Sequence, residues 1–244
     1  MLKKLFKSFF LNTIIWEYLI TLKNKFNLIF AKNYAQDHIN SILKKHIDYK
    51  NGFYIEIGAN DGVRQSNTLY FEKFKNWRGI LVEPSKRYNN LIKNRKKKNY
   101  FFNVACCSFE SINKYKSLYY ADLHTLSKNN IKQKDLESFQ KEVETHFSGK
   151  VEEFKIEQIP LNELLIKSKA PEIIDFFSLD VEGDELNILK GINFDDYKFK
   201  FLLIEGHEAE VTKFLLDKNY KVLKKLKYDI LYHYLDNVSP YPSK

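Results

Sequence analysis

Short apolar runs that stop at a carboxylate or a glycine recur along the chain. Such runs are typical of buried parallel strands that deliver polar groups to one edge of a sheet. Helical patterns separate most of them, and this alternation predicts an α/β fold with right-handed βαβ crossovers. The predicted strands are 53–57, 79–83, 100–106, 174–180 and 200–205, and the predicted helices between them are 68–74, 88–97 and 185–190.

A long segment, 107–173, separates the third and fourth predicted strands. It contains helical patterns at 136–146 and 160–167. A connection of this length in a compact domain is usually a lid or a substrate loop. We therefore predict that 107–160 is an insertion that covers the acceptor.

The two ends of the chain differ from the middle. Residues 220–226 and 229–235 alternate as an antiparallel hairpin does at a sheet edge. A helix is predicted at 34–45. These patterns divide the chain into a helical extension, 1–45, and one domain, 46–244.

The first residues carry a broad apolar stripe that predicts one or two amphipathic helices. The apolar stretch 8–16 is too short to span a bilayer, and no secretory cleavage site follows it. These helices would pack on the domain or on a second subunit, or contact an anionic membrane surface. The expected location is the cytoplasm or the inner face of its membrane. The stripe consists of Phe6, Phe9, Phe10, Ile14, Trp16, Leu19 and Phe26.

Net charge is +9, but only four of the forty basic residues are arginine. Arginine is the preferred reader of phosphates and base edges, so we predict no nucleic-acid partner. Cys106 and Cys107 are adjacent in an apolar run, which favours buried thiols in a reducing compartment.

Gly58 and Gly62 flank the turn after the first predicted strand, and Glu83 ends the second. In nucleotide-binding sheets an acid at that place accepts hydrogen bonds from ribose hydroxyls. The G-x-G-x-x-G turn of dinucleotide cofactors is absent, and Glu56 and Asp61 would repel a diphosphate. A cationic adenosine cofactor such as S-adenosylmethionine fits this charge better.

These residues resemble the FkbM family of S-adenosylmethionine-dependent methyltransferases. The resemblance implies a Rossmann-like class I methyltransferase sheet, mostly parallel, with an antiparallel edge hairpin and helices on both faces. It also implies methylation of a hydroxyl, commonly on a sugar or a polyketide. The resembling blocks are Tyr54–Gly62, Ser66-Asn67-Thr68, Trp77–Pro84, Asn103–Ala105, Asp180–Gly191 and Ile204–His207.

The resemblance also implies which residues hold the cofactor. Glu56, Gly58 and Asn67 are expected at the methionine end, Glu83 at the ribose, and the turn Asn103–Ala105 at the adenine. The cofactor residues within the same blocks further include Asn60, Asp61, Ser66 and Pro84.

Methyl transfer to oxygen requires alignment and removal of a proton. Asp180, Glu182, Glu205 and His207 follow the fourth and fifth predicted strands, so they are the candidate catalytic groups. His207 would act as a base oriented by Asp180 or Glu182. Alternatively, Asp180, Glu205 and His207 would hold Mg²⁺ or Mn²⁺. In a third interpretation, Asp180 and Glu182 only cap the next helix.

Two further features concern the acceptor. His124, in the insertion, is a candidate substrate contact. The run Lys93–Lys98 is expected to be a solvated helix end, or else to hold a phosphate of a nucleotide-linked sugar.

The predicted function is therefore O-methylation of a sugar or nucleotide-sugar in surface glycan (capsule or lipopolysaccharide) biosynthesis. The partner is then a small-molecule or glycan substrate. Two alternatives are a nicotinamide-dependent sugar oxidoreductase and a membrane-docked inactive binding module.

Overall fold

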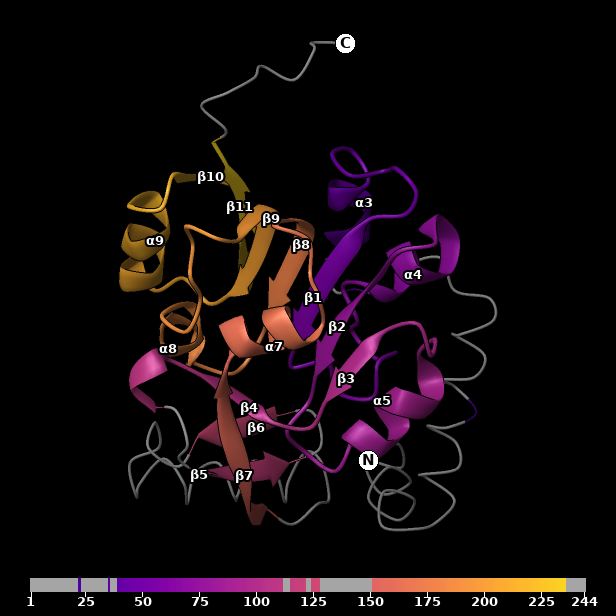
Figure 1. Ribbon diagram of the computed structural model, residues 1–244, viewed down its shortest axis with the longest axis vertical. Helices are drawn as coiled ribbons and strands as arrows, with labels where there is room; N and C mark the ends of the chain where they lie inside the picture. The colour runs from indigo at the N-terminus through magenta and orange to yellow at the C-terminus, as the bar shows by residue number, and fades with distance from the viewer. Residues whose placement is uncertain are drawn as a thin grey trace, which may run out of the picture.

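The computed structural model describes residues 39–111, 115–121, 124–127 and 151–235, together with Leu22 and Ala35 (Figure 1). The predicted N-terminal helices and the predicted helix 136–146 lie outside these residues, so they stay predictions. None of the helices in the described ranges is both long and apolar enough to cross a membrane.

A seven-stranded sheet forms the centre of the molecule, in the order β10-β11-β9-β8-β1-β2-β3. The five strands from β9 to β3 are parallel, and the hairpin of β10 and β11 adds an antiparallel edge. The predicted parallel sheet and edge hairpin are therefore confirmed. The bounds are β1 Phe53–Ile57, β2 Arg78–Val82, β3 Tyr100–Phe102, β8 Ile173–Leu179, β9 Lys198–Glu205, β10 Tyr220–Lys225 and β11 Asp229–Tyr234.

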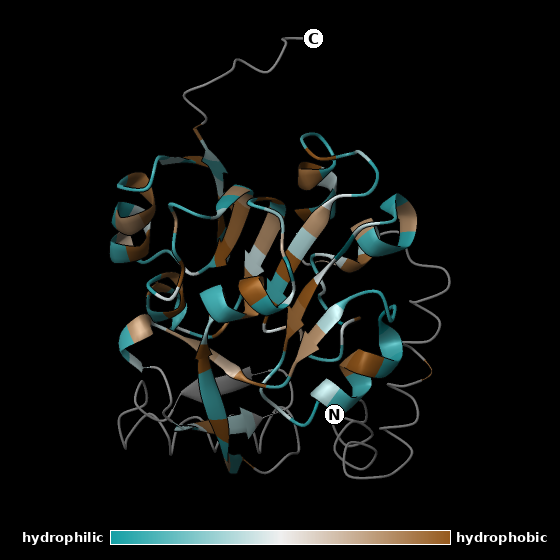
Figure 2. Cartoon of the chain, viewed as in Figure 1, coloured by the Kyte–Doolittle hydropathy of each residue, from teal (hydrophilic) through white to brown (hydrophobic). Residues whose placement is uncertain are grey.

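Helices cover both faces of this sheet because its central strands are apolar on both sides. Alternate residues face opposite layers, so that Ile55 packs with α7, α8 and α9 while Tyr54 packs with α3, α4 and α5. Figure 2 shows the apolar strands at the centre and polar residues on many turns and helices. The helices are α3 Ile39–Leu43, α4 Leu69–Lys75, α5 Tyr88–Asn94, α7 Leu161–Lys167, α8 Glu185–Leu189 and α9 Ala209–Leu216.

The insertion contains a second sheet that the hydrophobic pattern did not predict. Its strand order is β4-β7-β5-β6, with β4 Ala105–Cys107, β5 Tyr115–Ala121, β6 His124–Ser127 and β7 Glu152–Pro160. Figure 1 shows this sheet beyond the carboxyl ends of the large sheet. Four of the nine residues of the long strand β7 are exposed, and all four are charged, so no apolar run marks it.

The prediction of one strand over 100–106 is wrong, because the chain changes sheet at Asn103. Before it, β3 pairs with β2; after it, β4 pairs with β7. Asn103 Nδ2 donates to the backbone oxygens of Glu83 and Pro84, at 2.8 Å and 3.1 Å, which holds the turn.

Helix α9 was also not predicted. The prediction of buried thiols is confirmed, since Cys106 and Cys107 are free and buried.

Polar contacts join the small sheet to the segments that follow β2 and β8 of the large sheet. Arg87 Nε donates to the hydroxyl of Tyr120 at 2.7 Å. Lys116 on β5 forms an ion pair with Asp184, the residue just before α8. The small sheet thus has a fixed position at the strand ends, although the two sheets share no strand.

Gly191, two residues after α8, allows a close backbone contact between the end of this helix and β4. A Cβ at Gly191 would lie 1.9 Å from the carbonyl oxygen of Cys107. We expect Gly191→Ala to lower the free energy of unfolding by about 1–3 kcal/mol, because the backbones must move apart. Denaturant unfolding measures this. The adjacent exposed substitution Lys190→Ala should change the free energy by less than about 0.5 kcal/mol. Equal stability of both variants would contradict the packing argument.

Candidate functional site

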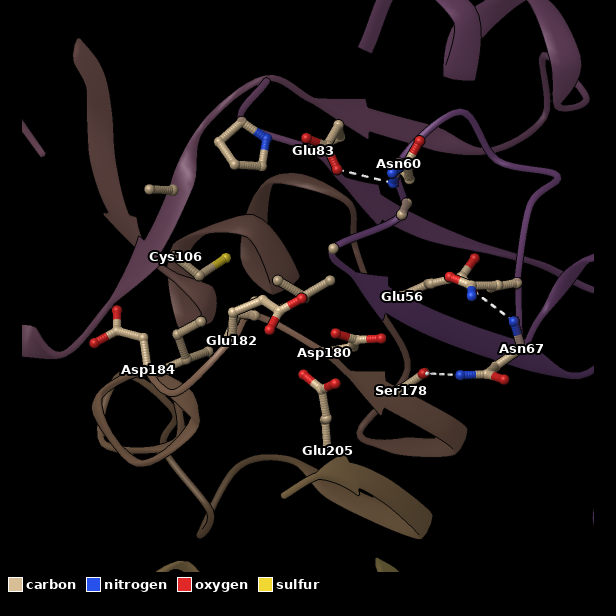
Figure 3. A pocket seen from close by; sticks show the side chains of 18 of the residues that line it. Glu56, Asn60, Asn67, Glu83, Cys106, Ser178, Asp180, Glu182, Asp184 and Glu205 are labelled. Carbon is tan, nitrogen blue, oxygen red and sulfur yellow. Dashed lines mark hydrogen bonds between the residues drawn. The ribbon is translucent and has the colours of Figure 1, made fainter. Parts of the chain in front are cut away.

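The carboxyl ends of β1, β2, β8 and β9 are level. Ile57 pairs with both Val82 and Leu179, and Leu179 pairs with Ile204. The residues that follow these strands therefore meet at one edge, where ligands of open α/β sheets bind. A pocket opens there (Figure 3). Lys116 and Leu118 of the small sheet also line it.

The turn after β1 depends on a glycine. Gly58 has φ +81°, and a Cβ there would lie 1.9 Å from the carbonyl oxygen of Asp180. The N–H groups of Gly58 and Ala59 both donate to the carbonyl oxygen of Val82, at 3.1 Å and 3.0 Å. No other residue could adopt this conformation without pushing the ends of β1 and β8 apart.

Glu83 occupies the place expected of a ribose-binding acid. Its side chain lines the pocket, and its two oxygens accept from the backbone N–H groups of Asn60 and Ser85, each at 2.8 Å. These bonds fix its orientation and leave each oxygen with capacity for another donor. Burial raises the pKa of Glu83, although these N–H groups oppose the shift.

Glu56 also lines the pocket, but its carboxylate is already engaged by the protein. One oxygen accepts from the N–H of Asn67 at 2.8 Å, and the other accepts from Thr68 Oγ1 at 2.6 Å and from Arg95 Nη1 at 3.1 Å. Ser66 Oγ lies 3.0 Å from both oxygens. Glu56 is therefore first a structural anchor of the loop between β1 and α4.

Two amide oxygens in the pocket wall are left for a ligand. Oδ1 of Asn60 and Oδ1 of Asn67 are buried and have no hydrogen-bond partner among the described residues. The amide of Asn67 is oriented, since its Nδ2 donates to Ser178 Oγ at 2.9 Å. An unpaired buried acceptor is costly, so these two oxygens are suited to accept from a donor on a bound ligand. Acceptors beside carboxylates fit a ligand with an ammonium, a sulfonium and ribose hydroxyls.

The remaining cofactor candidates divide into two groups. Ser66, Pro84 and Ala105 line the pocket with Gly58. Asp61 and Asn103 are absent from the pocket wall that the described residues form. Oδ1 of Asp61 accepts from the N–H groups of Val63 and Arg64, both at 2.9 Å, so it shapes the loop.

Three carboxylates meet at the ends of β8 and β9. One oxygen from each of Asp180, Glu182 and Glu205 lies within 4.8 Å of the others. Figure 3 shows these carboxylates pointing toward one another in the pocket. Although Asp180 keeps contact with solvent, enclosure by the protein and the nearby Glu205 raise the pKa of Asp180 well above its usual value. The group is thus a strong candidate for holding a proton or a cation.

The third interpretation is not what the structure shows, because the N-cap of α8 is Asp184, which makes no side-chain capping bond; the turn before the helix is held instead by Glu185. Its Oε1 accepts from the N–H groups of Val181 and Gly183, at 3.3 Å and 3.1 Å. Glu182 instead has φ +59°, a rare conformation for this residue type, and its side chain lines the pocket.

The structure does not bring His207 to the carboxylates. The side chain is exposed, and within the described part of the chain it belongs neither to the pocket wall nor to the group of close donors. His124 lies on β6, and the position of its side chain is outside the described residues. Its contact with a substrate stays a prediction.

Sequence reasoning missed five polar residues of the pocket, which are Arg64, Gln65, Lys116, Ser178 and Asp184. Ser178 was recognisable as a polar residue inside the apolar run of β8. Lys116 had no comparable signal, because it lies in an insertion whose strands were not predicted.

Comparison with known proteins gives a family match. The family model of the methyltransferase FkbM domain matches residues 56–229, a range that contains all of the pocket wall formed by the described residues. The comparison with curated proteins gives no match.

Solved structures give weaker similarities. TrmK of M. capricolum, in complex with S-adenosyl-homocysteine, is 13% identical over 85% of this chain and 73% of that chain, with a TM-score of 0.40. Precorrin-6y C5,15-methyltransferase from Geobacter metallireducens GS-15 is 13% identical over 81% of this chain and 89% of that chain, also with a TM-score of 0.40.

The pKa of Glu185 predicts how stability depends on pH. Burial raises the pKa to about 7, so the stability gained from the protonated carboxyl is present below about pH 4.5 and is lost as pH rises through 7. Gln keeps the accepting oxygen and does not titrate. We expect Glu185→Gln to gain up to about 3 kcal/mol of stability relative to the unsubstituted protein between pH 5 and pH 8.

Thermal unfolding at both pH values, in the presence of a chelator, measures this change. The exposed variant Glu172→Gln is the control and should show no such difference. A constant difference between Glu185→Gln and the unsubstituted protein would show that Glu185 ionises as an ordinary carboxyl.

Proposed function

Because the chain belongs to the FkbM methyltransferase family, we propose that it methylates a hydroxyl of a sugar or nucleotide-sugar. S-adenosylmethionine is the methyl donor. The observation that carries the proposal is the group of three carboxylates, Asp180, Glu182 and Glu205, in the pocket that would hold the donor. Membership of this family displaces the nicotinamide-dependent oxidoreductase as an alternative.

The chemistry of the acceptor explains why carboxylates are needed. Bound S-adenosylmethionine supplies an electrophilic methyl group. The acceptor oxygen forms the new bond to carbon, the carbon–sulfur bond breaks with its electron pair going to sulfur, and the hydroxyl proton must leave. A sugar hydroxyl is a weak acid, so a nearby proton acceptor or a metal ion is required.

Asp180 is the best-placed proton acceptor among the described residues. It follows β8 directly, and its backbone contacts Gly58 of the turn that lines the donor pocket. Its raised pKa makes it a stronger base than a free carboxylate. Glu182 and Glu205 then favour transfer of the proton, because a proton on Asp180 relieves repulsion among the three carboxylates. His207 is exposed and does not belong to this group, so we do not assign it the role of proton acceptor.

A metal-assisted form of the same reaction uses the same residues. Three carboxylates that converge within 4.8 Å supply the oxygen donors that Mg²⁺ and Mn²⁺ prefer. A cation there would lower the pKa of the acceptor hydroxyl. The donor set is then Asp180, Glu182 and Glu205, with Glu182 in place of the predicted His207.

The three carboxylates in the pocket also support the proposal that the acceptor carries several hydroxyl groups. Carboxylate oxygens accept hydrogen bonds and suit a ligand with several hydroxyl donors. A methyl-transfer screen with sugars and nucleotide-sugars, read by mass spectrometry, tests the acceptor class. Methylation of none of these acceptors by a protein that binds S-adenosylhomocysteine would contradict the sugar assignment. A role in surface glycan biosynthesis follows only from an acceptor of that kind.

The decisive variant is Asp180→Asn, which keeps the size of the side chain and removes the base. We expect S-adenosylhomocysteine binding by calorimetry to change less than about threefold, while turnover falls by roughly 100-fold or more. His207→Ala is the matched control and should keep nearly full turnover. Full turnover of Asp180→Asn would overturn the assignment of Asp180.

Chelation separates the two forms of the mechanism. Loss of turnover on chelation, with recovery on addition of Mg²⁺ or Mn²⁺, supports metal assistance. Full activity of the chelated enzyme leaves the carboxylate as the sole proton acceptor.

A further inference from the structure

Arg95 lies within the lysine-rich run 93–98, which sequence reasoning assigned to a solvated helix end or to a phosphate site. The structure shows a different position. Arg95 follows α5 directly, and its side chain is fully buried beneath the loop that joins β1 to α4. A buried guanidinium must have its donors satisfied and its charge compensated, so its partners show what it does.

The guanidinium makes six hydrogen bonds. Nε donates to Glu72 Oε2 at 2.9 Å, and Nη1 donates to Glu56 Oε2 at 3.1 Å. Tyr54 OH and Thr68 Oγ1 accept from Nη2 at 2.8 Å and 2.9 Å. Ser66 Oγ and the carbonyl oxygen of Gly62 accept from Nη1 at 3.2 Å and 3.3 Å.

Four of these contacts connect Arg95 to the cofactor pocket. Glu56 and Ser66 line the pocket themselves, and Thr68 and Gly62 belong to the same loop as Asn60 and Asn67. The loop also lies directly on Arg95, since a Cβ at Gly62 would come within 2.8 Å of its Cγ. A change in the position of the guanidinium therefore moves the pocket wall.

Glu72 holds Arg95 from the side away from the pocket. It is 2% exposed and is not part of the pocket wall that the described residues form. Although burial opposes the shift, Arg95 and the hydroxyl of Tyr54 lower the pKa of Glu72. Asn99 Nδ2 and the N–H of Lys96 also donate to it, at 2.5 Å and 3.0 Å. Glu72 thus fixes Arg95 without touching the site.

We propose that Arg95 is a positioning residue for S-adenosylmethionine: it holds Glu56 and the loop 58–68 in the arrangement that receives the donor. The positive charge of Arg95 then compensates the carboxylate of Glu56 at the pocket wall. The donor's ammonium would therefore be bound by acceptors that have no partner among the described residues, such as Asn67 Oδ1. The proposal concerns the donor alone and holds whichever acceptor is methylated.

The test measures S-adenosylhomocysteine binding by calorimetry at a temperature where every variant is folded. We expect Arg95→Met to weaken binding roughly 10- to 100-fold, because the loop loses its support. Arg95→Lys keeps the charge and should recover part of this loss. Glu72→Gln should weaken binding in the same direction although it does not line the pocket, and its effect should be non-additive with Arg95→Lys.

The control is Lys200→Met, which breaks the 2.7 Å ion pair with Asp175 at the opposite end of the sheet. We expect it to lower the thermal midpoint and leave binding unchanged. If Arg95→Lys and Glu72→Gln lower the midpoint but bind like the unsubstituted protein, Arg95 has only a structural role and the proposal is wrong. Should Arg95→Met fail to fold, the two milder variants decide the question.

Discussion

The close contact between the ends of β1 and β8 is the constraint on which the site depends. Gly58 meets the carbonyl oxygen of Asp180 at a distance that admits no side chain. This contact places the loop after β1, which lines the cofactor pocket, next to the turn after β8, which carries the acidic residues. Level strand ends then bring Glu83 and Glu205 to the same edge. The cofactor pocket and the group of carboxylates are adjacent because the backbones at the ends of β1 and β8 are in contact.

The molecule uses clustered carboxylates in two different ways. Glu56 and Glu72 share the guanidinium of Arg95, so their charges are compensated and their geometry is fixed. Asp180 and Glu205 instead have each other as neighbours, and the repulsion raises the pKa of Asp180. The first arrangement stabilises the pocket wall, and the second suits the proton acceptor that we propose, since catalytic sites often contain groups whose pKa values are separated in this way.

The large sheet was predictable because its central strands are buried on both faces and appear as short, mostly apolar runs. The strand ends were predictable for the same reason, and they identified Asp180 and Glu205. The prediction failed one turn further along the chain. Gly206, with φ +87°, redirects the backbone, and His207 leaves the site.

Arg95 was misjudged because its lysine neighbours are solvated while its own partners lie far away in sequence. The small sheet was missed because β7 alternates charged residues on an exposed face.

The pairing of β4 with β7 has a consequence for how such a chain can evolve. Ala105 pairs with Gln158 and Cys107 with Pro160, so the insertion leaves and re-enters the fold at neighbouring points. The entropy of closing a loop grows only slowly with its length. Segments of different length and sequence can therefore be exchanged between these two strands at little cost to the large sheet. One donor-binding core can in this way acquire new acceptors without being rebuilt.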